Sequence, residues 1–125
     1  MAGRPGPLNS TRRRIVVAPL AQRQINDALL ESRTRFGGPA AGRYAALIGE
    51  ALALLAEQPD HPGHKTLALG AVDIHLFHIR HARSRLKSDR QVRSPRHVIA
   101  YRFDEAMLEV AQMLHDAMDL PTRLR

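Results

Sequence analysis

Apolar residues in the first half of the chain recur at the spacing of a helix. One stripe consists of Ala21, Ile25, Ala28, Leu29, Ser32 and Phe36, and the nearby charged residues lie off it. This amphipathic pattern predicts a helix that buries one face and ends at Gly37 and Gly38.

Pro39 begins a second predicted helix with its own apolar face. That face consists of Tyr44, Ile48, Ala51, Leu52 and Leu55, and the segment EQPDHPG ends the helix after Ala56. Because a Gly-Gly-Pro turn connects the two helices, we expect them to lie antiparallel as a hairpin.

The pattern changes to alternation in the second half of the chain. In AVDIHLFHIRH, one face holds Val72, Ile74 and Leu76 and the other holds Asp73, His75 and Phe77, which predicts a strand. HVIAYRF is a further strand candidate, and a tight connection at Asp104 and Glu105 follows it. The next segment, MLEVAQMLH, fits either a strand or a helix. Between these segments KSDRQVRSP is polar and predicts a loop.

A first strand, RRIVVAP, precedes Pro19, which suits the first position of a helix. The predicted order is therefore a strand, two helices, about three strands and a short polar tail. This order predicts an α+β fold in which the antiparallel hairpin packs on one face of a small, mainly antiparallel sheet. The other sheet face is expected to be free for a partner. Residues 13–125 are expected to form one domain after a flexible lead of residues 1–12.

Composition restricts the chemistry and the cellular location. The 125 residues include no cysteine, which excludes disulfides and thiolate metal sites. No apolar run approaches the roughly 20 residues that a membrane span needs, and the apolar part of the N-terminal segment is too short for a signal peptide. We therefore expect a soluble, cytoplasmic protein.

The positive charge is concentrated in one region. The chain carries a net charge of +7, and the window from Ile74 to Arg102 has eight Lys or Arg and a single acid, Asp89. A focused positive field favours a polyanionic partner such as nucleic acid, or an acidic protein. The plainer alternative is a solvated sheet edge whose charges discourage aggregation.

The segment HLFHIRHARSRLK, from His75 to Lys87, allows three interpretations. A metal site is disfavoured because His75, His78 and His81 change sides along a strand and drift around a helix. A nucleic-acid-reading helix is disfavoured by the alternating pattern and by the lack of a helix-turn-helix signature. We prefer a basic strand and its extension, whose guanidinium groups form a row on an open β surface and bind phosphate or carboxylate.

Two C-terminal segments resemble ParE toxins of the RelE/ParE superfamily. In PRHVIAYRF the matching residues are His97, Ile99, Tyr101 and Arg102, and in the ending they are Leu114, His115, Met118, Asp119, Leu120 and Pro121. The resemblance runs from about Arg13 to the end of the chain. It implies a strand–helix–helix–three-strand fold and a type II toxin that a cognate antitoxin neutralises by wrapping around it.

The resemblance leaves two targets open. ParE-like members poison DNA gyrase without chemistry of their own, and RelE-like members cut mRNA on the ribosome. For gyrase the expected target-binding residues are Arg80, Arg83, Arg85, Arg96, His97, Arg102 and His115. For a nuclease the catalytic candidates are His115, Tyr101, Arg80 and Arg83. Neither activity requires a metal or another cofactor.

Purely structural roles are alternatives to these functional ones. Tyr101 suits a core or edge aromatic better than a catalyst, and His115 could equally pin the C-terminal tail through a hydrogen bond. The apolar helix faces could be completed by the antitoxin or by a second copy of the chain, as a homodimer within a toxin–antitoxin hetero-oligomer. A third hypothesis is an inert relative that retains only antitoxin binding.

Overall fold

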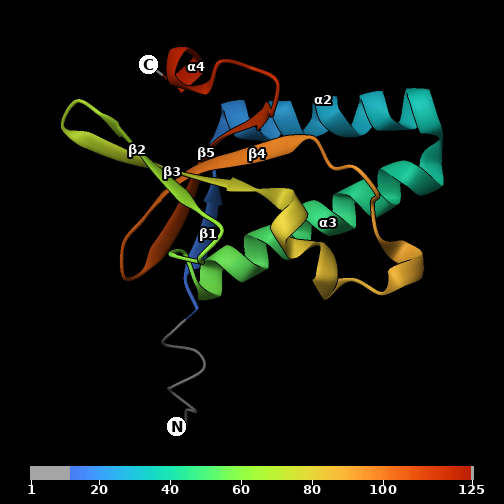
Figure 1. Ribbon diagram of the computed structural model, residues 1–125, viewed down its shortest axis with the longest axis horizontal. Helices are drawn as coiled ribbons and strands as arrows, with labels where there is room; N and C mark the ends of the chain where they lie inside the picture. Colours follow the sequence, from blue (N-terminus) through green and yellow to red (C-terminus); the bar gives the residue numbers. More distant parts are fainter. Residues whose placement is uncertain (1–11, 125) are drawn as a thin grey trace, which may run out of the picture.

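The computed structural model describes residues 12–124 and has the α+β architecture that the sequence predicts (Figure 1). In chain order the elements are β1 (Arg14–Val17), α2 (Pro19–Phe36), α3 (Gly38–Glu57), β2 (Lys65–Leu69), β3 (Val72–His78), η1 (Ile79–Arg85), η2 (Ser88–Arg90), β4 (His97–Phe103), β5 (Met107–His115) and α4 (Leu120–Leu124), where η1 and η2 are 3-10 segments. The expected flexible lead, apart from Arg12, lies outside the described residues. Within residues 12–124, each helix is too short or too polar to span a membrane.

The predicted helical hairpin is confirmed. Pro19 is the first residue of α2, where its missing N–H leaves no helical hydrogen bond unmade. Gly37 separates the helices with a φ of 93°, a left-handed conformation that glycine adopts without steric cost. The predicted burial of Phe36 is wrong, because the side chain at this last residue of α2 is 70% exposed.

The sheet has the strand order β1-β5-β4-β3-β2. Strand β1 runs parallel to β5, and the other neighbours are antiparallel. The ambiguous segment MLEVAQMLH is strand β5. Strand β2 was not predicted, because KTLAL is short and gains its order mainly by pairing with β3 across the turn at Gly70.

The core lies between the hairpin and one face of the sheet. Strand residues that face the helices include Phe77, Ile99, Tyr101, Leu108 and Val110, all of them fully or almost fully buried. Leu47 and Leu55 of α3 pack against this face. Burial of this apolar surface is the main source of stability and fixes the hairpin on the sheet.

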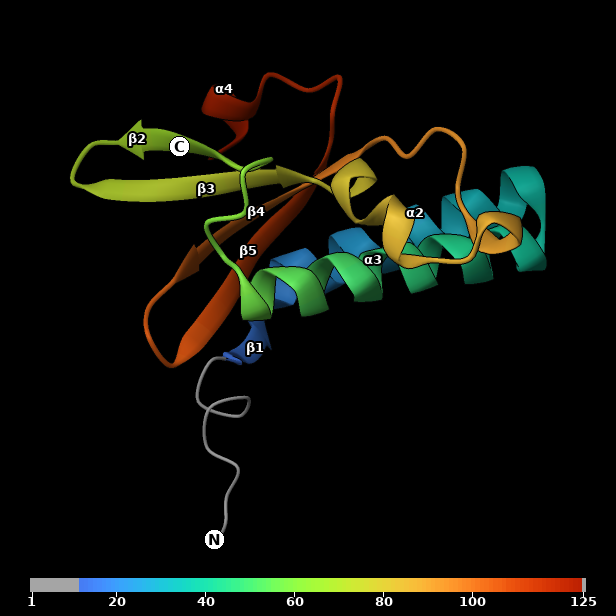
Figure 2. The same cartoon turned by 60° about the horizontal axis from the view of Figure 1, so that its bottom comes forward.

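The opposite sheet face is partly covered, which corrects the expectation that it would be free. Val98, Ala100 and Leu114 point to this face, as their cross-strand pairing requires, and all three are buried. In Figure 2 the C-terminal helix α4 lies beside the β2–β3 hairpin, on the side turned away from α3. The residue Leu124 shares a shallow groove with Leu69, Val72 and Ile74.

Candidate functional site

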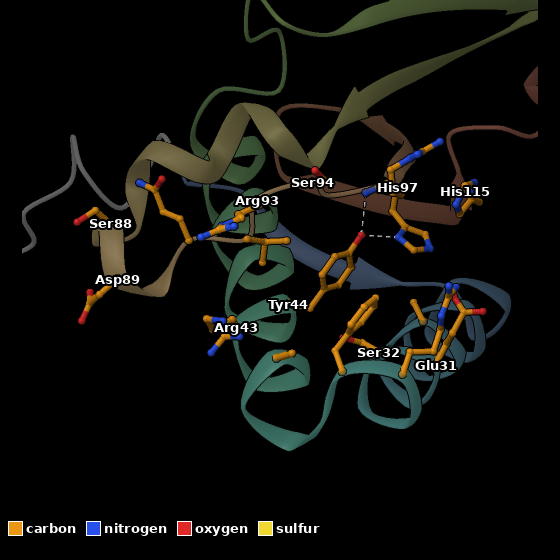
Figure 3. A pocket seen from close by; sticks show the side chains of 17 residues that line it. Glu31, Ser32, Arg43, Tyr44, Ser88, Asp89, Arg93, Ser94, His97 and His115 are labelled. Carbon is orange, nitrogen blue, oxygen red and sulfur yellow. Dashed lines mark hydrogen bonds between the residues drawn. The ribbon is translucent and has the colours of Figure 1, made fainter.

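An open cavity of about 900 Å³ lies between the closed end of the α2–α3 hairpin and the segment that leads from η2 into β4 (Figure 3). Helix α2 contributes Ala28, Glu31, Ser32, Arg35 and Phe36, and α3 contributes Ala40, Arg43 and Tyr44. The remaining lining residues are Ser88, Asp89, Gln91, Val92, Arg93, Ser94, Arg96, His97 and His115. The cavity therefore gathers side chains that are distant in sequence.

Tyr44 and His97 are hydrogen-bonded in the wall of the cavity. The Tyr44 hydroxyl accepts a hydrogen bond from the Arg96 backbone N–H at 3.1 Å and lies 2.6 Å from Nδ1 of His97. Because the hydroxyl oxygen can accept two hydrogen bonds and donate one, the tautomer of His97 sets which of the two groups donates in the second contact.

Burial controls the protonation of this pair. It is the main reason that the pKa of His97 falls to about 4, and the neighbouring His115 lowers it further. Burial also raises the pKa of Tyr44 above its ordinary value. At neutral pH the cavity therefore presents an uncharged imidazole and an uncharged phenol.

His115 lies opposite His97 across strands β4 and β5. The two residues are register partners, and their ring centroids are 5.5 Å apart with the planes at 77°. Nδ1 of His115 accepts a hydrogen bond from the Ala117 backbone N–H at 3.1 Å. His115 therefore both fixes the chain after β5, as one of its expected roles requires, and lines the cavity.

The rim of the cavity is positively charged. Arg35, Arg43, Arg93 and Arg96 line it, against the acids Glu31 and Asp89. Arg96 binds Asp116 at 2.9 Å, whereas within residues 12–124 the other three guanidinium groups make no ion pair. Three guanidinium groups without an ion pair thus line the cavity together with two carboxylates, which leaves an excess of positive charge.

The expected row of guanidinium groups on a basic strand is not formed. Strand β3 ends at His78, and Arg80, Arg83 and Arg85 belong to the 3-10 segment η1. The strand stops there because Ile79 and Ala82, three residues apart, are both buried and η1 packs against α3. A 3-10 turn places residues three apart on the same side, which an extended strand cannot do.

The arginines of the expected row bind separate partners. Arg83 donates to the Arg93 carbonyl at 2.7 Å, and Arg85 donates to Glu50 of α3 at 3.1 Å. Arg102 binds Glu109 on the neighbouring strand β5. These contacts tie loops and strands of the fold together, and the three side chains do not line the cavity.

Asp116 joins His78 to Arg96, one of the expected target-binding residues, on the outer side of the sheet. Its carboxylate accepts hydrogen bonds from His78 Nε2 and Arg96 Nε, each at 2.9 Å. Burial alone would raise the pKa of Asp116, but these two hydrogen bonds outweigh it and the pKa is lowered. The Arg80 backbone N–H donates to His78 Nδ1, so both ring nitrogens of His78 are occupied.

The three histidines of the segment from His75 to Lys87 lie in different surroundings. His75 and His78 point to opposite faces of β3, as their register partners Tyr101 and Val98 show. His81 lies in η1 and packs near Phe77 and His61. Across residues 12–124 there is no cluster of three or more side chains suited to hold a metal ion.

Of the seven expected target-binding residues, the structure brings Arg96, His97 and His115 together at the cavity. Tyr101 is fully buried, and its hydroxyl donates to the Pro59 carbonyl. The hairpin residues Tyr44, Arg43 and Phe36 were missed as site residues. Helical periodicity places Tyr44 on the buried face, but it gives no sign that the hydroxyl would reach β4.

The assembled groups suit binding of an anion with one or more polar contacts. Guanidinium groups pair with phosphate or carboxylate, and a neutral imidazole can donate or accept a single hydrogen bond.

In comparisons with known proteins, no family model matches this chain and no curated protein is significantly similar to it.

Proposed function

We propose that this chain is a ParE-like toxin of a type II toxin–antitoxin system, which acts in the cytoplasm by binding DNA gyrase. A cognate antitoxin neutralises it by covering the same surface. The mode of action is occupancy of the target, with no reaction carried out by the toxin.

The observation that carries this proposal is the juxtaposition of the two segments that resemble ParE. HVIAYRF and the strand that leads into LHDAMDLP are the adjacent strands β4 and β5, and His97 lies opposite His115. These strands border an open, positively charged cavity. The order of strand, helical hairpin and sheet also agrees with the fold that the resemblance implies, apart from the additional strand β2.

A supercoiling assay with purified gyrase tests the proposal. Addition of the purified protein is expected to inhibit supercoiling and to trap cleaved DNA, and premixing with the antitoxin should restore activity. Unchanged supercoiling at a large excess of folded protein would count against a gyrase target. A small adjacent gene for an antitoxin would supply the neutralising protein for this control.

A second candidate is a RelE-like, ribosome-dependent mRNA interferase. The paired His97 and His115 beside Arg96 favour it, because RNA cleavage needs a base, an acid and a cation near the phosphate. The catalytic set expected from the sequence is disfavoured, because the hydroxyl of its member Tyr101 is buried in the core. In a translating extract, cleavage that is lost with His115→Ala would replace the gyrase proposal.

Induction in a bacterium without the antitoxin separates both activities from an inert relative. A toxin of either kind is expected to arrest growth, and co-expression of the antitoxin should restore it. Normal growth with abundant, folded protein would indicate a chain that retains antitoxin binding alone.

A further inference from the structure

The cavity has an arginine end and a histidine end. Figure 3 shows Arg43 of α3 and Arg93 of the η2–β4 segment at one end, with Asp89 beyond them, and His97 and His115 at the other end, with Tyr44 between. Arg43 and Arg93 are exposed and have no ion-pair partner among the described residues. Two guanidinium groups that face the same hollow repel each other, and the one carboxylate at this end, Asp89, forms an ion pair with neither of them. An anion between the two arginines would remove the remaining repulsion.

The start of α3 adds to the positive potential. Ala40, in its first turn, lines the cavity. Helix α3 has no acidic residue in that turn and no side-chain cap at Gly37, so its N-terminal dipole is not compensated by the chain. The helix therefore favours negative charge at the same end of the cavity as Arg43.

An exposed aromatic ring completes the lining. Phe36 lies at the end of α2 with 70% of its surface exposed, although Arg35 stacks over the ring at 5.6 Å. Apolar contact is also available from Ala28, Ala40 and Val92. A ligand that satisfies the whole lining thus combines an anionic group with a planar ring.

We propose that this cavity is a nucleotide-binding site. Arg43 and Arg93 hold the phosphate through charge-assisted hydrogen bonds, and the base stacks on Phe36. The volume of about 900 Å³ is within the usual range for small-molecule sites. The nucleotide is either free or one unit of a single-stranded nucleic acid. This inference goes beyond the gyrase proposal and does not depend on it.

Fluorescence anisotropy with a short, labelled oligothymidylate tests the phosphate contacts at one fixed salt concentration, because such binding depends strongly on salt. The double variant Arg43→Gln/Arg93→Gln is expected to weaken binding about tenfold or more. The matched control is Arg23→Gln/Arg33→Gln, which removes the same charge from exposed positions on α2 outside the cavity. The control variant should bind almost as tightly as the unmodified protein.

A second pair of variants tests the stacking contact. Phe36→Ala is expected to weaken binding of the oligonucleotide about tenfold and to leave the affinity for inorganic phosphate unchanged. Leu30→Ala removes another exposed apolar side chain from α2 and should have little effect. Thermal unfolding of all variants checks that they are folded.

Competition identifies the source of the nucleotide. Displacement of the probe by a mononucleotide indicates a site for free nucleotides, and displacement by an unlabelled strand alone indicates a site for nucleic acid. An acidic peptide that binds through Arg43 and Arg93 without loss in Phe36→Ala, while nucleotides fail to bind, would overturn the proposal. Equal weakening by the cavity and control double variants would also overturn it, because binding would then follow net charge alone.

Discussion

The two tyrosines illustrate how single residues acquire their roles from their neighbours. Tyr44 lies on the apolar stripe of α3 and is largely buried, yet its hydroxyl connects the Arg96 backbone to the His97 ring. Tyr101 is at the centre of the core and closes a loop by donating to the Pro59 carbonyl. Only Tyr44 is near the cavity, so a functional role at the site belongs to it.

The hydroxyl of Tyr101 is expected to contribute to stability and not to activity. Tyr101→Phe leaves the buried Pro59 carbonyl without its donor, which should lower the free energy of unfolding by about 1–3 kcal/mol. Urea denaturation measures this change. Growth arrest by the variant should persist at a temperature at which it remains folded. Loss of toxicity with unchanged stability would instead place Tyr101 in the functional machinery.

At the scale of elements, helix α2 and the C-terminal segment complete the sheet. Strand β1 pairs with β5 only as far as Val110, and beyond it Gln24 of α2 accepts a hydrogen bond from the Met113 N–H at 2.8 Å. On the outer face, Asp116 fixes the chain after β5, and α4 then brings Leu124 beside β2 and β3. The side chain of Gln24 thus satisfies a backbone group at the free edge of β5, and the short helix α4 covers part of the outer face of the sheet.

The contact of α4 with the sheet can be measured with one substitution. Leu124 is half-buried beside Val72 and Ile74, so Leu124→Ser should lower the free energy of unfolding by about 1 kcal/mol. Leu30→Ser is the matched control, because Leu30 is 64% exposed and its loss should change stability by less than about 0.5 kcal/mol. Equal effects of the two variants in urea denaturation would show that α4 does not protect the sheet.

At the scale of the whole molecule, some arginines form ion pairs within the fold and others face the cavity without an ion pair. Arg85, Arg96 and Arg102 are used in ion pairs that join different elements. Arg43 and Arg93 remain unpaired within residues 12–124 and face the cavity. The net charge of +7 is therefore larger than the number of unpaired cationic side chains that a partner can contact at the cavity.

Stability of the whole fold is expected to decrease in mild acid. Burial, with help from His115, lowers the pKa of His97 to about 4, whereas the unfolded chain takes up this proton near pH 6.5. The unfolded state therefore binds the proton first as the pH falls. The free energy of unfolding should decrease between about pH 6.5 and 4, on the order of 2 kcal/mol after allowance for partial exposure.

Comparison with His97→Asn isolates this contribution, because the side-chain amide can still form a hydrogen bond with Tyr44 but does not titrate. Denaturation across this pH range should show a shallower decrease in the variant. Some decrease should remain, since burial also lowers the pKa of His75 and of His81. Identical pH profiles would show that His97 is not the group responsible.

The sequence by itself determined the elements whose signals are local. Periodicity identified the hairpin because the buried faces of α2 and α3 are continuous stripes, and Pro19, Gly37 and Gly38 mark their ends. Alternation identified β3 and β4, and an acidic turn marked the connection from β4 to β5: the Asp104 carboxylate accepts hydrogen bonds from Ala106 and Met107. Each of these features depends on residues close together in the chain.

Only the tertiary structure decided which charged and polar side chains meet. A count of arginines cannot show which of them form ion pairs. Arg85 pairs with Glu50 and Glu57 of α3, whereas Arg43 and Arg93 form no ion pair within residues 12–124 and line the cavity. The cavity depends on packing between the hairpin tip, the η2–β4 segment and the ends of two strands, which are separated by tens of residues. Hydrophobic burial sets that packing without direction, so the contacts between polar groups follow from the whole fold and not from their spacing in the sequence.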